Sequence, residues 1–242
     1  MRKHLMWRGL VALACLALTF TGCSPGFPVL GPSVPSSRIL FVGNSFTYIN
    51  GGVDQEVKGL APTIEAKSIA VGGYTLQDHW NDGEALKSIR EQKWNSVVLQ
   101  DQSQTPVIAQ AQFVEYARKF NAEIRLAGGN TILFMTWERP DSVAYGVTTQ
   151  NLANAYYKAG NELNARVAPV GIAFSRALGE RPGLALYVQD GHPTAQGTYL
   201  AACVLYATIF SKSPAGNSYS AAGVSKEERD FLQRVAADVT GY

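Results

Sequence analysis

Residues 38–51 read RILFVGNSFTYING, and the first half of this stretch determines the fold class. RILFVG is a short, unbroken apolar run that ends in glycine, which is typical of a strand buried on both faces of a parallel sheet. Further apolar runs lie at 64–73, 96–100, 131–137 and 167–174. Stretches with helical length and periodicity alternate with them, at 54–61, 83–92, 107–126, 150–167, 195–210 and 225–239. This alternation predicts an α/β fold, a three-layer α/β/α sandwich with a central parallel sheet of about five strands and right-handed crossovers.

The first 23 residues have the pattern of a processing signal. Arg2, Lys3 and Arg8 precede an apolar segment at 10–20 that is too short to span a bilayer as a stable helix. The segment ends in LTFTGCSPG, which resembles the lipobox of bacterial lipoproteins, with Cys23 as the residue that receives the lipid. We therefore expect export and a lipid anchor, with cleavage elsewhere by ordinary signal peptidase as the alternative.

Three segments follow from this pattern. Residues 1–23 form the signal peptide and lipobox, residues 24–37 form a tether rich in Pro, Gly and Ser, and residues 38–242 form the folded domain. Because Ser24 follows the cysteine, the resemblance to lipoprotein sorting signals implies placement in a bacterial outer membrane, facing the periplasm. The N-terminal lipid is the only expected contact with a membrane.

Composition restricts the possible partners and cofactors. The chain has 242 residues, a formal net charge of +2 and 46% hydrophobic residues, which fits one domain without a basic stripe for nucleic acid. Cys203 lies alone in an apolar run and is expected to be a buried small hydrophobe. Only His79 and His192 follow the signal, and no metal-ligand or phosphate-loop motif is present. We therefore expect no metal and no cofactor.

Parallel strands place their ligands beyond their carboxyl ends, so the residues to inspect are 43–47, 72–75, 100–103 and 137–139. Ser45 stands at a strand-to-helix turn, where it is either a nucleophile or a helix cap. A serine nucleophile needs a base, and His192 lies in a Gly/Pro loop directly before an apolar helix. His79 is expected to pack beside Trp80 or to hydrogen-bond locally. Asp190 either orients His192 or forms an Asx turn.

Acyl transfer also needs donors for the oxyanion of its tetrahedral intermediate. The backbone amides of Ser45 and Gly73 and the side-chain amide of Gln102 are suitable groups in suitable loops. The alternatives are that Gly73 is only a turn glycine and that Gln102 is only a surface residue. Gln100 competes with Gln102 for the donor role.

The order of these pieces resembles the SGNH (GDSL-like) hydrolases, which carry a GDS block, a glycine donor, an asparagine donor and a late DxxH block. Here FVGNSFT resembles the first block with Asn44 in place of Asp, VGGYT the second, VVLQDQS the third without its Asn, and DGHPTAQGTYLAA the fourth. In the fourth block Asp190 stands two residues before the histidine, where the family has three. The GNSFT form resembles a subgroup of these proteins that are often lipoproteins.

The resemblance implies a flavodoxin-like sheet and a serine esterase in which Ser45 attacks and His192 carries the proton, with or without Asp190. Tyr48, Tyr74, Trp80 and Trp137 lie in or near the active-edge loops and would suit stacking on sugars, or else are core residues. We therefore expect hydrolysis of small acyl esters, acetyl above all, on a glycan or glycoside. The alternatives are a lysophospholipase or thioesterase, and a non-catalytic lipoprotein that binds a glycan in the same cleft.

Overall fold

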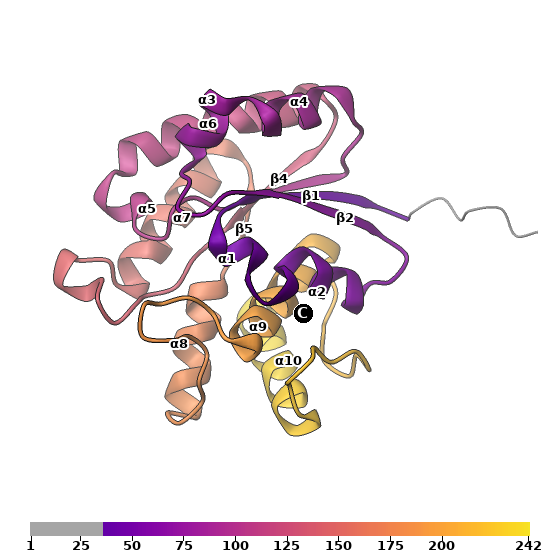
Figure 1. The fold of residues 1–242 in the computed structure, drawn as a ribbon, viewed down its shortest axis with the longest axis vertical. Coiled ribbons are helices and arrows are strands. Elements are labelled where there is room, and N and C mark those ends of the chain that lie inside the picture. The colour runs from indigo at the N-terminus through magenta and orange to yellow at the C-terminus, as the bar shows by residue number, and fades with distance from the viewer. Residues whose placement is uncertain (1–35) are drawn as a thin grey trace, which may run out of the picture. The chain divides into compact units, whose positions relative to one another are not determined.

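A five-stranded parallel sheet forms the centre of the protein (Figure 1). The structure is a computed structural model, which describes residues 36–242. The strand order is β2-β1-β3-β4-β5, with every neighbouring pair parallel. This flavodoxin-like order confirms the predicted fold class. The strands are β1 (Arg38–Gly43), β2 (Glu65–Ala70), β3 (Ser96–Leu99), β4 (Asn130–Phe134) and β5 (Arg166–Ala168).

Helices cover both faces of the sheet and complete the three layers. One face carries α3 (Leu76–Asp82), α4 (Glu84–Glu91), α6 (Gln110–Leu126) and α7 (Thr149–Leu163). The other carries α2 (Val53–Leu60), α8 (Val170–Glu180), α9 (Ala195–Phe210) and α10 (Lys226–Thr240). Four short helical turns lie in the loops between these elements: α1 (Ser45–Tyr48), η1 (Ile49–Gly51), α5 (Thr105–Ile108) and η2 (Val143–Tyr145).

β1 is buried on both faces, as its unbroken apolar sequence predicts. Ile39 and Phe41 belong to the core under α9, whereas Leu40 and Val42 belong to the core under α6, and each is at most 1% exposed. Burying such side chains contributes about 1.5–3 kcal/mol apiece. The strand that precedes Ser45 is therefore held from both sides.

α9 is apolar on every side because it is enclosed on every side. It packs against α2, α8 and α10 and against β4 and β5, and all its residues from Gly197 to Ile209 are buried. Cys203 is fully buried within it, and burial raises the pKa of its thiol. The prediction for Cys203 is confirmed. The helix also gives a rigid support to the His192 loop, which precedes it.

The predicted fifth strand at 167–174 is largely wrong. Only Arg166–Ala168 pairs with β4, and the apolar residues that follow Pro169 begin α8. A short apolar run fits a buried helix segment as well as a strand, and here Pro169 separates the two. Gly171 permits the close approach of α8, since a Cβ there would collide with the Thr136 backbone.

Two other boundaries differ from the predictions. The helix α3 is absent from the predicted elements, although Thr75 and Asp78 form a capping box at its start and are a readable helix signal. The folded domain also begins earlier than residue 38, because the amide of Ser36 donates to the Thr63 carbonyl and the amide of Glu65 donates to the carbonyl of Ser37. The last two residues of the predicted tether therefore pair with the domain.

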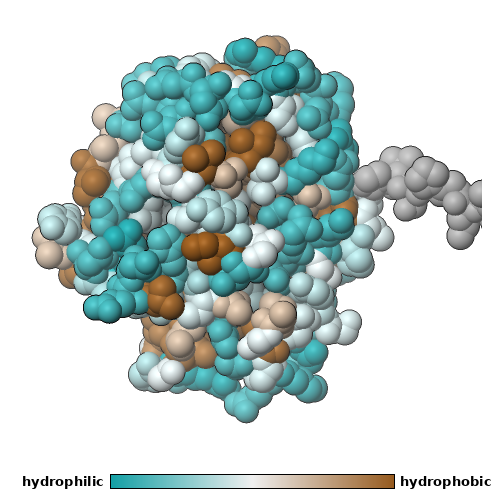
Figure 2. Space-filling model, in the orientation of Figure 1, coloured by the Kyte–Doolittle hydropathy of each residue, from teal (hydrophilic) through white to brown (hydrophobic). Residues whose placement is uncertain are grey.

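The face seen in Figure 2 is mainly hydrophilic, with small separate apolar spots. Within residues 36–242, no helix is both long and apolar enough to span a bilayer. The predicted signal peptide and most of the tether, with Cys23, lie outside the described residues.

Candidate active site

Ser45 stands at the first turn after β1, on a backbone that its neighbours shape tightly. Asn44 caps α1, accepting a hydrogen bond from the Phe46 amide on its side-chain oxygen at 3.2 Å. Gly43 has no room for a side chain, because a Cβ there would collide with the Thr47 hydroxyl and the Gln100 side chain. Ser45 is half-buried and presents its hydroxyl at the carboxyl edge of the sheet.

His192 approaches Ser45 from the far end of the chain. Its Nε2 lies 2.9 Å from the Ser45 Oγ, and its Nδ1 lies 3.0 Å from a carboxylate oxygen of Asp190. With the imidazole proton on Nδ1, Nε2 is free to accept the hydroxyl proton of Ser45. The geometry therefore supplies a nucleophile, a base and an orienting carboxylate in one line.

The Asp190 carboxylate differs from a buried triad carboxylate in its exposure. It also accepts a hydrogen bond from the His192 backbone amide at 3.0 Å, which is an Asx-type contact. This contact and the hydrogen bond from the His192 imidazole both lower the pKa of Asp190. Both uses expected for Asp190 are therefore present at once. Its side chain is 68% exposed, so water screens its charge.

The turn that carries His192 is fastened at three points. The amide of Val188 donates to the His192 carbonyl, and Tyr187 and Pro193 form an isolated bridge that closes the turn. Gly191, in the left-handed region at φ 85°, accepts a hydrogen bond from the Trp137 indole at 3.0 Å. The base is therefore held by the loop after β4 as well as by α9.

A cavity of about 300 Å³ opens in front of the Ser45–His192 pair. It is lined by Asn44, Ser45, Phe46, Tyr48, Gly72, Gly73, Gln102, Ser103, Arg139 and His192. All four loop segments singled out in the sequence contribute to this lining. The amides of Ser45 and Gly73 make no hydrogen bond within the described residues, so both are free to donate into the cavity.

Gln102 and Gln100 have different surroundings. Gln102 lines the cavity, and its side-chain oxygen accepts from the amide of Gln104 at 2.8 Å, while its Nε2 has no partner among the described residues. Gln100 is fully buried, and its oxygen accepts from the Asn44 amide and from the Thr47 hydroxyl, both at 2.9 Å. Its Nε2 donates to the Asp101 carbonyl. Gln100 therefore stabilises the turn around Ser45, and Gln102 is the glutamine of this pair whose side-chain amide is left free beside the cavity.

Asn44 has a reason to be an amide. Its Nδ2 donates to the Tyr74 carbonyl at 3.0 Å, which ties the Ser45 turn to the loop that carries Gly73. A carboxylate at this position has no proton to donate. The hydrogen bond to the Tyr74 carbonyl thus explains why an asparagine stands where the GDS pattern has an aspartate.

Replacing Asn44 by Asp is expected to lower the free energy of unfolding by at least about 2 kcal/mol at neutral pH, because a buried carboxylate would then face a carbonyl oxygen. Urea unfolding at pH 7 measures the change. The loss should shrink in acid as the carboxyl protonates. An Asn44→Asp variant as stable as the wild type at pH 7 would contradict this role of the amide.

Asp101 lies beneath the same two loops. One of its carboxylate oxygens accepts from the Leu76 amide at 3.2 Å and from the Gln102 amide at 2.7 Å, so it links the start of α3 to the Gln102 loop. Its other oxygen is buried without a partner among the described residues. Burial raises the pKa of this carboxyl to about 7, against the two amide contacts that lower it.

This raised pKa predicts a specific dependence of stability on pH. The folded state holds the Asp101 proton more tightly than the unfolded state, so its contribution is complete below about pH 4 and is lost as the pH rises through about 7. Asp101→Asn should remove that part of the decline, as seen in melting temperatures taken from pH 4 to 8. Parallel curves for the two proteins would refute the assignment.

His79 has a structural position, as expected. It is fully buried, its Nε2 donates to the Gly43 carbonyl at 2.7 Å, and its ring meets Tyr74 edge-on rather than Trp80. Burial lowers its pKa, so the ring is neutral at pH 7. It supports the Ser45 turn from behind.

The aromatic residues divide into core and cavity. Trp137 is 1% exposed and is stacked between Phe46 and Phe174, with ring centroids 4.4 and 4.2 Å away. Trp80 packs on Phe120 on the other side of the sheet. Of the four predicted sugar platforms, Tyr48 lines the active cavity and is 46% exposed.

Arg139 lines the cavity and lies in the 137–139 segment singled out from the sequence, although no role was predicted for it. Its guanidinium contacts the Ser103 hydroxyl and the carboxylate of Asp141, and its aliphatic part packs on Gly191 so closely that a Cβ there would collide with it. A lone arginine in a loop carries no motif. Its position just after the fourth apolar run is the signal that placed it among the residues to inspect.

No protein-family model and no curated protein matches this sequence. Solved structures do match. A protein from Slackia heliotrinireducens assigned to the SGNH hydrolases is 28% identical, covers 72% of this chain and 98% of its own, and has a TM-score of 0.63.

Two more distant structures share the fold. A DUF4886 family protein from Bacteroides uniformis is 17% identical, covers 85% of this chain and 95% of its own, and has a TM-score of 0.66. A mutant of an acetyl-xylooligosaccharide esterase from Geobacillus is 15% identical over 72% of this chain and 94% of its own, with a TM-score of 0.55. The fold is the one that the sequence motifs predict.

Proposed function

We propose that this chain, which has the fold of the SGNH (GDSL-like) hydrolases and is a hydrolase acting on esters, removes small acyl groups, acetyl above all, from a glycan or glycoside. The observation that carries the proposal is the Ser45–His192 pair, 2.9 Å apart, at a cavity with free amide donors. A serine, a base in contact with it and donors beside it are the parts that acyl transfer needs.

The arrangement supports the following chemistry. The Ser45 oxygen attacks the ester carbonyl while its proton passes to His192 Nε2, and the carbonyl oxygen becomes an oxyanion facing the amides of Ser45 and Gly73 and the Gln102 side chain. The C–O bond to the alcohol then breaks, and the imidazolium returns the proton to the departing alcohol. A water molecule, activated by the same imidazole, releases the acid from the acyl-enzyme.

The size and lining of the cavity favour a short acyl group. A volume of about 300 Å³ is at the lower end of ligand pockets, and Phe46 and Tyr48 are the only large apolar side chains in its lining. The exposed Tyr48 ring beside Ser45 suits a sugar better than an acyl chain. One neighbour in fold acts on acetylated xylo-oligosaccharides, which agrees with this direction.

Hydrolysis of 4-nitrophenyl esters of increasing length tests the proposal. The value of kcat/KM should be highest for acetate and should fall steadily towards octanoate and decanoate. A preference for eight or more carbons would favour the lysophospholipase or thioesterase alternative. Absence of turnover, together with no labelling of Ser45 by a fluorophosphonate, would favour the non-catalytic glycan-binding alternative.

We also propose that the protein is anchored by a lipid on Cys23 in a bacterial outer membrane, facing the periplasm. The support is the sequence pattern of residues 1–23 and the Pro/Gly/Ser-rich segment after it. Incorporation of a radiolabelled fatty acid, absent from the Cys23→Ala variant, measures the modification directly. Equal labelling of both proteins would overturn it.

A further inference from the structure

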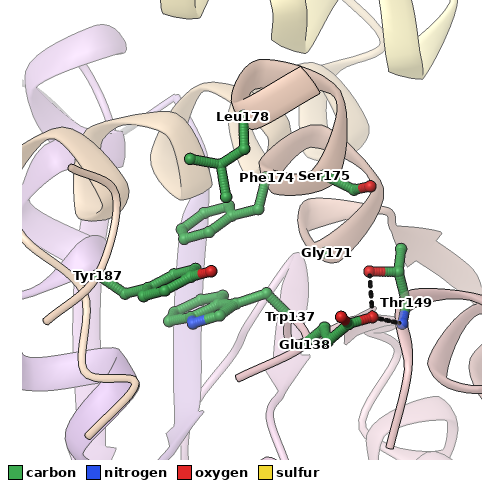
Figure 3. A pocket seen from close by; sticks show the side chains of 8 residues that line it. All are labelled: Trp137, Glu138, Thr149, Gly171, Phe174, Ser175, Leu178 and Tyr187. Atoms are coloured by element: carbon green, nitrogen blue, oxygen red, sulfur yellow. Dashed lines mark hydrogen bonds between the residues drawn. The ribbon is translucent and has the colours of Figure 1, made fainter. Parts of the chain in front are cut away.

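A second cavity, of about 230 Å³, lies next to the active site and takes no part in the chemistry above. Figure 3 shows it from close by. Its lining comes from the loop after β4, from the start of α7, from α8 and from the turn that ends at His192. The residues are Trp137, Glu138, Thr149, Gly171, Phe174, Ser175, Leu178 and Tyr187.

The two sides of this cavity differ in chemistry. Tyr187, Phe174 and Leu178 gather on one side, whereas Glu138, Thr149 and Ser175 bring oxygens to the other (Figure 3). A ligand that fits both sides has apolar C–H surface on one face and hydroxyl groups at its rim. A sugar ring has this form.

Glu138 is the charged group of the cavity, and its charge is not neutralised. One carboxylate oxygen accepts from the amide of Thr149 at 2.7 Å and faces its hydroxyl at 3.3 Å. The other oxygen has no partner among the described residues, and Glu138 makes no ion pair there. A fixed carboxylate with a free oxygen accepts charge-assisted hydrogen bonds from hydroxyl groups, which are stronger than those to a neutral acceptor.

The same loop and the same turn supply lining residues to this cavity and to the active-site cavity. Successive residues of one loop line different cavities: Glu138 lines this one, and Arg139 lines the one in front of Ser45. Tyr187 and His192 likewise stand at the two ends of one closed turn. Trp137 separates the two spaces, stacked between Phe46 of the active cavity and Phe174 of the second.

We propose that the cavity beside Glu138 is a carbohydrate subsite, which binds a further sugar ring of the glycan whose ester lies at Ser45. The inference rests on the proposed esterase activity. Tyr187 and Leu178 receive the apolar face of the ring, and Glu138 accepts from its hydroxyls. Binding energy from this remote ring lowers the barrier at Ser45 for glycans and not for simple esters.

The test compares a methyl xyloside that carries one acetyl group with xylotriose that carries one acetyl group on a terminal ring and has its other hydroxyls free, with 4-nitrophenyl acetate measured beside them. The wild type should prefer the trisaccharide over the monosaccharide by about tenfold in kcat/KM. Glu138→Gln keeps an oxygen for the Thr149 amide but removes the charge, and Tyr187→Ala removes the ring. In each variant, the ratio of kcat/KM for the trisaccharide to that for the monosaccharide should fall towards one.

Two matched variants control for general effects. Glu84→Gln changes an exposed carboxylate at the start of α4, and Tyr157→Ala removes a tyrosine that is 42% exposed on α7, and neither residue lines either cavity. Both should keep the wild-type preference. Equal kcat/KM for the two sugars in the wild type, or an unchanged preference in Glu138→Gln and Tyr187→Ala, overturns the subsite. Failure of the wild type on 4-nitrophenyl acetate as well would instead overturn the esterase.

Discussion

The Ser45→Ala variant is expected to lose at least about 10³-fold in kcat on 4-nitrophenyl acetate, because it removes the oxygen that forms the acyl-enzyme. His192→Ala should lose about 10²–10⁴-fold, since His192 Nε2, 2.9 Å from the Ser45 Oγ, is the one basic group in contact with that hydroxyl among residues 36–242. The double variant should be little worse than either single one, because the two residues act as a unit.

Asp190→Ala is expected to cost about tenfold or less, because an exposed ion pair is worth only about 0.2–1 kcal/mol. Steady-state rates of the wild type and the four variants under the same conditions give the comparison. A loss at Asp190 as large as that at His192 would show a full triad despite its exposure. Wild-type activity no higher than that of Ser45→Ala would refute the catalytic assignment altogether.

The second large effect is expected at Gln102. Gln102→Leu removes the side-chain donor proposed for the oxyanion, and one such donor is worth about 10²–10³-fold in kcat. Gln102→Glu is the sharper variant, because it keeps the oxygen that accepts from the Gln104 amide and replaces the donor by a negative charge. It should be at least as damaging, with KM changed much less than kcat.

Gln100→Leu is the matched comparison. Its amide makes three hydrogen bonds inside the protein and lies outside the cavity lining, so the variant should mainly lose stability, by about 2 kcal/mol or more. Rates measured beside urea unfolding separate the two glutamines. If Gln100→Leu lost kcat without stability while Gln102→Leu lost neither, the two roles would be reversed.

The fold was largely predictable from the apolar runs. RILFVG, SVVLQ and TILFMTW are buried strands because their residues alternate between two cores, and crossover rules then restrict the sheet order. The run at 167–174 could not be resolved in the same way. Its side chains are buried in either conformation, and the position of Pro169 relative to the sheet edge is a tertiary property.

The site was predictable where chemistry restricts the choice of residue. Only two histidines follow residue 23, so His192 was the natural candidate for the base, and the sheet topology explains why it lies beside Ser45. The different roles of Gln100 and Gln102 could not be predicted from the sequence. Both are glutamines in the same loop, and only the directions of their side chains distinguish them. Glu138 and Arg139 belong to the 137–139 segment singled out from the sequence, but they have no motif, and only the cavities that they line indicate a role for each.

Trp137 is placed to serve as an intrinsic fluorescent probe of the two cavities. Its indole is one of three among residues 36–242, and it touches a wall residue of each cavity while holding the turn of the base through Gly191. Trp94 lies in the core on the opposite face of the sheet, and the partly buried Trp80 packs against that core. A ligand in either cavity is therefore expected to change the emission of Trp137 more than that of the other two, so stopped-flow fluorescence can be used to look for glycan binding and release without a label.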